Sequence, residues 1–401
     1  MKRIIFSILM IAASFFGFSE DGKIFRFKYS KEDNYRILST VKENVMLNGR
    51  FSHYSEILNR VSVRVTDVDD GGRGFNEGIF MTSESSVGRG GNFSWGEEYE
   101  SKFWRDSQGV YEISDEYFMP VVRDVPIFPE TPVGIGESWT ASGHEAHDLG
   151  RQFGMNKPFK IPFTVEYTYA RDEVIGGKTF CVIEANYEIS YASPEPKFMM
   201  EDYPAYTMGF SNQTIFWDAE KGQIDHYYED FRIVIESALG MTLDFQGTAH
   251  AEVTDFERAA TDENLKDVQN KVSELGLENV TVAQSDKGLT ISIENIQFKA
   301  DSAVLEESEK EKLKMISEIL KEYQNDILVA GHTARAGSEA SCQQLSEERA
   351  DSVAEYLIGL GVRDKYHILT IGHGSKIPVA SNSTAKGMAK NRRVEITILD
   401  K

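Results

Sequence analysis

The stretch from residue 331 to residue 350, GHTARAGSEASCQQLSEERA, has residue types and spacing suited to binding a small charged group. Its start predicts the end of a buried strand, its small residues predict a turn, and its second half predicts a helix. Cys342 and Arg349 are almost two helical turns apart, so both project from the side that faces the turn. The Arg349 guanidinium could bind a carboxylate as a forked pair, and loop amides near Ser338 could add donors.

The same turn lacks the carboxylate that a cationic ligand group would need. Ala334 stands where an acceptor is expected, and Arg335 adds a positive charge that disfavours an ammonium group. Glu339 and Glu348 are the nearest candidates for a substitute acceptor. A salt bridge within the protein, for instance from Arg349 to Glu339, is the alternative role for the arginine. The residues alone leave both roles open.

The N-terminal segment has the pattern of a secretory signal peptide. Lys2 and Arg3 precede an apolar run that ends at Phe16, and small residues follow the run before Glu20. The run is shorter than the roughly 20 residues that span a membrane. We therefore expect residues 1–19 to be removed on export. No cysteine lies near this site, which argues against a lipid anchor.

Length and charge narrow the classes of function. A chain of 401 residues is too long for one ordinary core, which predicts two domains. Of the 43 basic residues, Lys2 and Arg3 leave with the signal, so 41 remain against 64 acidic ones and the formal charge becomes −23. Such a field repels phosphate backbones, so we expect no nucleic-acid partner. Cys181 and Cys342 fall in different predicted domains, which favours free thiols over a disulfide.

Residues 20–255 show the period of two that is typical of strands. The segment NRVSVRVTD is an example, in which one face holds Val61, Val63 and Val65 and the other Arg60, Ser62 and Arg64. The same alternation runs from Ile161 to Tyr169 and from Cys181 to Tyr191, with a Gly-Gly turn between them that suits a hairpin. The pattern predicts an all-β domain built on one large antiparallel sheet.

From residue 256 to residue 401 helical and strand patterns alternate. Apolar residues at helical spacing predict three helices, over Leu265–Leu275, Leu313–Tyr323 and Leu345–Leu360, the last ending at Gly361. Short apolar runs predict strands in LTISIENIQF, DILVAGHT, HILTIGHG and RRVEITIL. The second domain is therefore expected to be α/β with crossover helices, and the chain as a whole to be of mixed class.

Two clusters in the β-rich domain lack the spacing of metal sites. HEAHD, at residues 144–148, has one residue after the Glu where the zinc protease pattern needs two, and we expect it in a glycine-flanked loop. DVDDGGRG would place the glutamate of a calcium loop at Gly78, so a hairpin turn explains it better. We expect no metal and no cofactor.

Four blocks follow one another at close spacing in the C-terminal region. They are FKADSAVL (298–305), GHT (331–333), QQLSEERADSVAEYLIGLGV (343–362) and IGHGSKIPVASNSTAKGMAKNRRVEITI (371–398). Together they resemble the OmpA-like peptidoglycan-binding domain of bacterial envelope proteins, over about residues 262–401. No family resemblance extends to residues 20–255.

The resemblance implies a βαβαβ-type domain that tethers proteins to the cell wall. In that family an Asp directly after GHT and the Arg of LSxxRA grip the diamino acid of the peptidoglycan stem peptide, and an Asn three residues before the Leu helps. Arg349 matches the arginine, whereas Ala334 and Cys342 replace the Asp and the Asn. Thr333 and Leu345, in the matching blocks, complete the expected ligand site.

The two departures have an estimable effect on affinity. A hydrogen bond to a charged group contributes on the order of 1.5–3 kcal/mol, or about ten- to a hundredfold in affinity. We therefore expect weak binding unless a residue such as Glu339 substitutes. Asn391 and Arg392, in the NRR block beside the groove, are expected mainly to support the fold, with ligand contact as the alternative.

The sequence thus predicts a non-enzymatic protein of the cell envelope, located in the periplasm or at the outer membrane. No nucleophile and base can be paired, and no phosphate loop is present. The expected partners are peptidoglycan, bound weakly, and an unknown envelope protein or ligand for the β-rich domain. One alternative is a degenerate OmpA-like domain that serves as a protein-interaction module. Another makes residues 20–255 an outer-membrane β-barrel.

Overall fold

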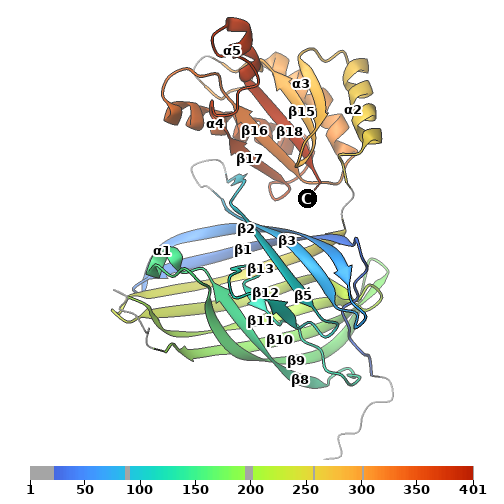
Figure 1. The fold of residues 1–401 in the computed structure, drawn as a ribbon, viewed down its shortest axis with the longest axis vertical. Coiled ribbons are helices and arrows are strands. Elements are labelled where there is room, and N and C mark those ends of the chain that lie inside the picture. The colour runs from blue at the N-terminus through green and yellow to red at the C-terminus, as the bar shows by residue number, and fades with distance from the viewer. Residues whose placement is uncertain (1–21, 86–90, 195–201, 256–257, 300–301, 401) are drawn as a thin grey trace, which may run out of the picture.

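A computed structural model of the chain describes residues 22–85, 91–194, 202–255, 258–299 and 302–400. Two sheets dominate it, a large one built by the N-terminal region and a smaller, helix-covered one built by the C-terminal region (Figure 1). The mixed fold class expected from the sequence is thereby confirmed. The predicted signal peptide, residues 1–19, lies outside the described residues.

The large sheet has twelve strands within the described residues, in the order β6-β5-β3-β2-β1-β13-β12-β11-β10-β9-β8-β7. The strands are β1 (Asn34–Leu47), β2 (Arg50–Val68), β3 (Gly74–Glu84), β5 (Glu98–Arg105), β6 (Tyr111–Ile113), β7 (Val122–Arg123), β8 (Ser138–His147), β9 (Phe159–Ile175), β10 (Lys178–Ala192), β11 (Pro204–Asp218), β12 (Gln223–Ser237) and β13 (Thr242–Asp255). All neighbours are antiparallel, and β1 pairs with both β2 and β13. The first and last long strands of the region therefore lie side by side. A short helix, α1 (Gly150–Phe153), follows β8.

The predicted hairpin turns are confirmed. Gly176 and Gly177 join β9 to β10 with φ of 59° and 85°, a backbone conformation that favours glycine. In DVDDGGRG, the Asp69 carboxylate accepts the backbone N–H groups of Gly71 (3.0 Å) and Arg73 (2.8 Å). That carboxylate therefore shapes the turn between β2 and β3.

Aromatic side chains fill the core of the large sheet. Phe25, from the segment before β1, stacks on Phe128 with ring centroids 5.3 Å apart, and Phe128 meets Trp217 edge-on at 4.7 Å. All three side chains are fully buried, as is Tyr167 of β9. The alternation along β9 and β10 therefore has the expected cause, since one face of these strands packs in this core.

The smaller sheet has the order β14-β15-β18-β16-β17-β4 in the part of the chain that is described. Its strands are β4 (Phe93–Ser94), β14 (Val280–Gln284), β15 (Gly288–Glu294), β16 (Ile327–His332), β17 (Ile368–Gly372) and β18 (Arg393–Leu399), and the helices of the region are α2 (Asp262–Glu274), α3 (Glu307–Lys321), α4 (Glu339–Gly359) and α5 (Ala385–Asn391). The three predicted helices correspond to α2, α3 and α4, and α4 ends before Gly361, whose φ is 71°. Strand β14 and helix α5 were not expected.

One strand of the smaller sheet comes from the N-terminal region. Strand β4 lies parallel to β17, with Phe93 opposite Leu369 and Ser94 opposite Thr370. The N–H of Trp95 extends the pairing by donating to the carbonyl of Thr370 at 2.8 Å. The N-terminal region thus protects an edge of the C-terminal sheet that would otherwise be open, which the sequence did not indicate.

A buried ion cluster holds the two sheets together. Asp326, just before β16, lies 2.8 Å from Arg60 Nε of β2 and 2.8 Å from Arg36 Nη1 of β1. Its side chain is 0% exposed, and those of Arg36 and Arg60 are 9% and 4% exposed. Apolar side chains surround the contact, among them Leu58 of β2 and Leu328 of β16. Both sheets therefore share one core at this point.

Two further observations bear on the surroundings of the molecule. None of the helices in the described residues is long and apolar enough to cross a membrane. Cys181 and Cys342 are both buried free thiols, as expected from their places in different predicted domains.

We predict that Asp326→Ala strongly destabilises the protein. The change leaves the guanidinium groups of Arg36 and Arg60 buried without their shared counterion, and breaking a buried pair in this way costs about 3–5 kcal/mol. Urea unfolding measures the loss. Glu307→Ala, which removes an exposed acid paired with Lys310 on α3, is the matched control and should leave the unfolding midpoint unchanged. Equal midpoints for the two variants would contradict the role of Asp326.

A second prediction concerns pH. Burial, aided by the nearby Glu84 carboxylate, raises the pKa of Glu43 on β1 to about 7. Because the folded-state pKa lies above the unfolded one, this group's contribution to stability is present at pH 4 and is lost as pH rises through 7. Glu43→Gln should therefore match the wild type at pH 4 and exceed it at pH 8 by on the order of 2 kcal/mol. Urea unfolding across this pH range, with the exposed Glu116→Gln as control, tests the difference.

Candidate functional site

The GHT block and the helix that follows it are arranged as the sequence predicted. Strand β16 ends at His332, a turn follows, and α4 begins after Ser338, whose hydroxyl accepts the N–H of Ser341 at 3.1 Å. Gly337 in the turn has a φ of 85°, which suits glycine. The N–H of Thr333 donates to the carbonyl of Gly374 at 2.9 Å, which ties the turn to the loop after β17. A fixed turn thus faces the first part of α4.

The guanidinium of Arg349 lies over an aromatic ring. Its Cζ is 4.7 Å from the centroid of Phe298, a residue of the first matching block. Its Nε is buried and has no hydrogen-bond partner, and within the described residues no carboxylate forms an ion pair with it. Burial, together with the nearby positive charge of Arg392, lowers the pKa of Arg349. A guanidinium in this state is a ready partner for an external anion.

The acids considered as partners of Arg349 are engaged elsewhere. Glu339 lies 3.4 Å from Lys376 Nζ, and its side chain is 72% exposed. Glu348 accepts a hydrogen bond from the Gln344 amide at 2.9 Å. The salt bridge from Arg349 to Glu339, which the sequence left open, is therefore not formed.

Ala334 and Cys342 occupy the positions at which the family carries Asp and Asn, and both are buried. The Cys342 thiol donates to the carbonyl of Ala336 at 3.1 Å and lies 3.8 Å from that of Ala334. The thiol therefore fastens the turn to α4. The hydroxyl of Thr333 is buried without a partner, and Leu345, in the third matching block, is half-buried.

Asn391, the last residue of α5, holds the loop beside this turn. It is fully buried, and its carbonyl oxygen accepts the N–H groups of Val379 (2.9 Å) and Ala380 (3.0 Å). Its amide donates to Asn382 Oδ1 at 2.9 Å, and the same oxygen accepts the N–H of Arg335 at 3.2 Å. Asn391 thus links the loop to the turn, which supports the expected role in the fold.

Arg392 and Arg335 add positive charge to the same region. The Arg392 guanidinium donates to Asn295 Oδ1 at 3.2 Å, and the Arg335 side chain is exposed. With Arg349, the region holds three cations and, at Ala334, no acceptor. Its electrostatics suit a carboxylate better than an ammonium group.

Sequence reasoning missed two members of this region. Phe298, which supports the guanidinium, was part of a matching block but had no assigned role. Asn382, which joins Asn391 to Arg335, lies in a loop with no periodicity. The signal for Phe298 was its place in the FKADSAVL block, which the family resemblance brings to the site.

The first four residues of the HEAHD cluster, His144 to His147, end strand β8, so the expectation of a glycine-flanked loop is wrong for them. His144 Nδ1 is 3.2 Å from Asp124, and His147 Nε2 is 2.6 Å from the buried Glu145. The other oxygen of Glu145 accepts the Tyr187 hydroxyl at 2.7 Å. Alternation along the strand sends these side chains to internal partners. Among the described residues, no group of three or more metal-binding side chains is found.

Comparison with known proteins gives matches to the C-terminal region. The model of the OmpA family matches residues 297–392. "Probable lipoprotein YiaD" of Escherichia coli is 41% identical over 121 residues, which cover 30% of this chain and 55% of the relative. "Peptidoglycan-binding protein ArfA" of Mycobacterium bovis is 42% identical over 104 residues, which cover 26% of this chain and 32% of the relative.

A solved structure matches the same region. It is an outer membrane protein of Borrelia burgdorferi B31, 39% identical, and the match covers 30% of this chain and 96% of that one, with a TM-score of 0.25. The chain thus spans about half of YiaD and about a third of ArfA, but almost all of the Borrelia protein. The C-terminal region of the chain therefore contains an OmpA-family domain, at residues 297–392.

Proposed function

We propose that this is a non-enzymatic cell-envelope protein whose OmpA-like domain, residues 256–401, associates weakly with peptidoglycan. The observation that carries the proposal is the guanidinium of Arg349, which is stacked on Phe298 and has no acid partner among the described residues. A carboxylate of the stem peptide is a suitable ligand for it. The name of ArfA, a peptidoglycan-binding protein, supports the choice of ligand.

The binding is expected to be weak because one of the two charged groups of the ligand has no partner in the site. A stem-peptide diamino acid carries an ammonium group as well as a carboxylate, and Ala334 offers it no acceptor. The loss corresponds to on the order of 1.5–3 kcal/mol. The positive charges of Arg335 and Arg392 oppose the ammonium group further.

We assign residues 20–255 to a second domain, which binds a separate partner. The location that fits both domains is the periplasm, reached by means of the predicted signal peptide. The names of the relatives, which include a lipoprotein and an outer membrane protein, support a place in the envelope.

A second candidate function is a protein-interaction module without peptidoglycan binding. The observation that favours it is the Cys342 thiol. It donates to the carbonyl of Ala336, within the turn, at 3.1 Å and is therefore not available to donate to a ligand. Co-sedimentation of the full chain with purified peptidoglycan separates the two functions. Sedimentation that Arg349→Ala abolishes supports binding, and its absence in the wild type supports the module.

We predict that Ala334→Asp strengthens peptidoglycan binding by about ten- to a hundredfold, since it restores an acceptor near Arg349. The measurement is the dissociation constant from co-sedimentation at increasing peptidoglycan. Ala336→Asp, which adds the same charge to an exposed position of the turn, is the matched control and should have a much smaller effect. A tight-binding wild type that Ala334→Asp leaves unchanged would contradict the assignment of this position.

A second prediction addresses the arginine itself. Arg349→Ala should abolish the residual binding of the wild type, because the guanidinium is the main charged donor of the site. Lys314→Ala, which removes an exposed positive charge from α3, should leave binding unchanged. Equal loss in both variants would indicate nonspecific attraction to charge, and thermal melting of each variant checks that the fold is retained.

A further inference from the structure

A cavity of about 520 Å³ lies in the N-terminal region, well apart from the Arg349 site in the fold. It is lined mainly by strands β1, β2, β3 and β5, by the segment before β1, and by the turn between β11 and β12. The volume is within the range of small-molecule sites, roughly 300–1,000 Å³. Nothing in the proposed peptidoglycan contact uses it.

One wall of the cavity is a row of valines. Val61, Val63 and Val65 alternate along β2 and all three line the cavity, together with Ile37 of β1 and Phe80 of β3. From Val61 to Val65 the strand rises by roughly 13 Å, at about 3.3 Å per residue. An apolar row of this length suits an extended alkyl chain better than a single ring.

A cation without a counterion stands in the same cavity. The guanidinium of Arg105, at the end of β5, lies 3.8 Å from the ring centroid of Phe27 and 4.6 Å from that of Tyr111. Its Nε donates to the carbonyl of Gly109 at 3.1 Å, but its Nη2 is buried and unpartnered. Within the described residues no carboxylate forms an ion pair with it. Removing an unpaired charge from water costs free energy, and a bound anion would offset that cost.

A second donor lines the cavity with Arg105. The Tyr29 hydroxyl is buried and has no partner, and burial raises its pKa well above the usual range, so the hydroxyl keeps its proton. The ring is held in place by Gly74, where an added Cβ would lie 2.5 Å from the ring of Tyr29. Both unpartnered groups can therefore donate to one anionic head.

The acidic residues of the cavity are engaged by protein groups. Glu32 forms an ion pair with Arg64, and Asp33 accepts the N–H of Ser30 at 2.7 Å. Neither carboxylate pairs with the guanidinium of Arg105. The Asp124 carboxylate, whose charge also acts on Arg105, accepts the N–H of Tyr111 at 2.8 Å and forms no ion pair with the guanidinium either.

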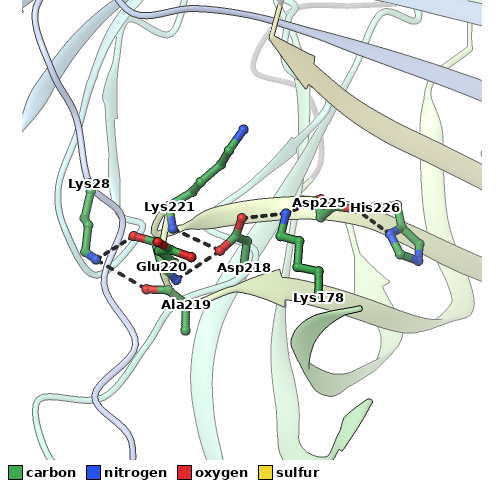
Figure 2. Close-up of polar contacts among 8 residues, drawn as sticks. All are labelled: Lys28, Lys178, Asp218, Ala219, Glu220, Lys221, Asp225 and His226. Carbon is green, nitrogen blue, oxygen red and sulfur yellow. Dashed lines mark hydrogen bonds and ion pairs between the residues drawn. The ribbon is translucent and has the colours of Figure 1, made fainter. Parts of the chain in front are cut away.

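The rim of the cavity at the turn between β11 and β12 is built rigidly. Asp218 accepts the N–H groups of Glu220 and Lys221, and the Lys28 ammonium donates to the carbonyls of Ala219 (3.3 Å) and Glu220 (2.9 Å) (Figure 2). Lys178 joins Asp218 at 2.8 Å to Asp225 at 3.1 Å. These bonds fix the backbone of the turn, whose residues Lys221, Gly222 and Gln223 line the cavity.

We propose that this cavity binds an alkyl carboxylate, a fatty-acid-like molecule. The carboxylate accepts hydrogen bonds from Arg105 Nη2 and the Tyr29 hydroxyl, and the alkyl chain lies along the valines of β2. The apolar wall selects for the chain, and the unpaired guanidinium selects for the negative charge of the head. Binding here is separate from the association with peptidoglycan and does not depend on it.

Calorimetric titration of the full chain tests the proposal with three probes of equal chain length, each below its micellar concentration. Decanoate carries the anion, decanol has no charge, and decyltrimethylammonium carries a cation. We expect decanoate to bind about ten- to a hundredfold more tightly than decanol, the value of a charged hydrogen bond, and the ammonium probe to bind least. Equal affinities for all three, or no decanoate binding, would overturn the proposal.

Variants locate the site. Arg105→Met keeps the length of the side chain but removes the charge, so decanoate affinity should fall to that of decanol, whose own affinity stays unchanged. Tyr29→Phe removes one donor without disturbing any bond within the protein and should weaken decanoate binding severalfold, which keeps the test valid if Arg105→Met does not fold. Arg73→Met is the matched control, because Arg73 also stacks on an aromatic ring, Trp104, but does not line the cavity. Decanoate binding that survives both Arg105→Met and Tyr29→Phe would place the ligand elsewhere.

Discussion

The contact of Asp326 with Arg36 and Arg60 is the interaction on which the arrangement of the two sheets depends. One buried carboxylate forms ion pairs with two guanidinium groups of the neighbouring sheet, at 2.8 Å each. Because such charges are tolerated away from water only with their partners in place, this contact allows few alternative dockings. The pairing of β4 with β17 and the contacts of Glu56 with Lys365 and Tyr366 surround the same point.

Strand β2 serves both sheets because its side chains alternate. Val61, Val63 and Val65 line the cavity, whereas Leu58 and Arg60, on the opposite face of the strand, contact the C-terminal sheet. The period of two was visible in the sequence and predicted the strand correctly. It could not show that a second sheet covers the arginine face, since the partner of Arg60 is 266 positions away. Strand β4, two residues long, left no periodic signal at all.

At the Arg349 site the sequence predicted the strand, the turn and the helix but not the aromatic ring that packs against the guanidinium. Spacing on a helix placed Arg349 and Cys342 on one side, and the strand, turn and helix follow as expected. The stacking on Phe298 depends on how distant segments meet, which spacing does not determine. Likewise, the sequence shows Cys342 only as the loss of an expected ligand contact. In the structure its thiol donates a hydrogen bond to the carbonyl of Ala336 in the turn.

Four arginines of this protein can be divided into two groups by what their guanidinium groups contact. Arg60 and Arg393 face carboxylates of the chain, Asp326 and Glu395, and their charges serve the fold. Arg105 and Arg349 are half-buried and stack on phenylalanine rings, and within the described residues neither forms an ion pair with a carboxylate. Stacking compensates only part of the cost of taking a guanidinium out of water. In the first group the counterion is a carboxylate of the same chain. In the second, an acid supplied from outside the protein would complete the pair, and this common feature links two sites on different sheets.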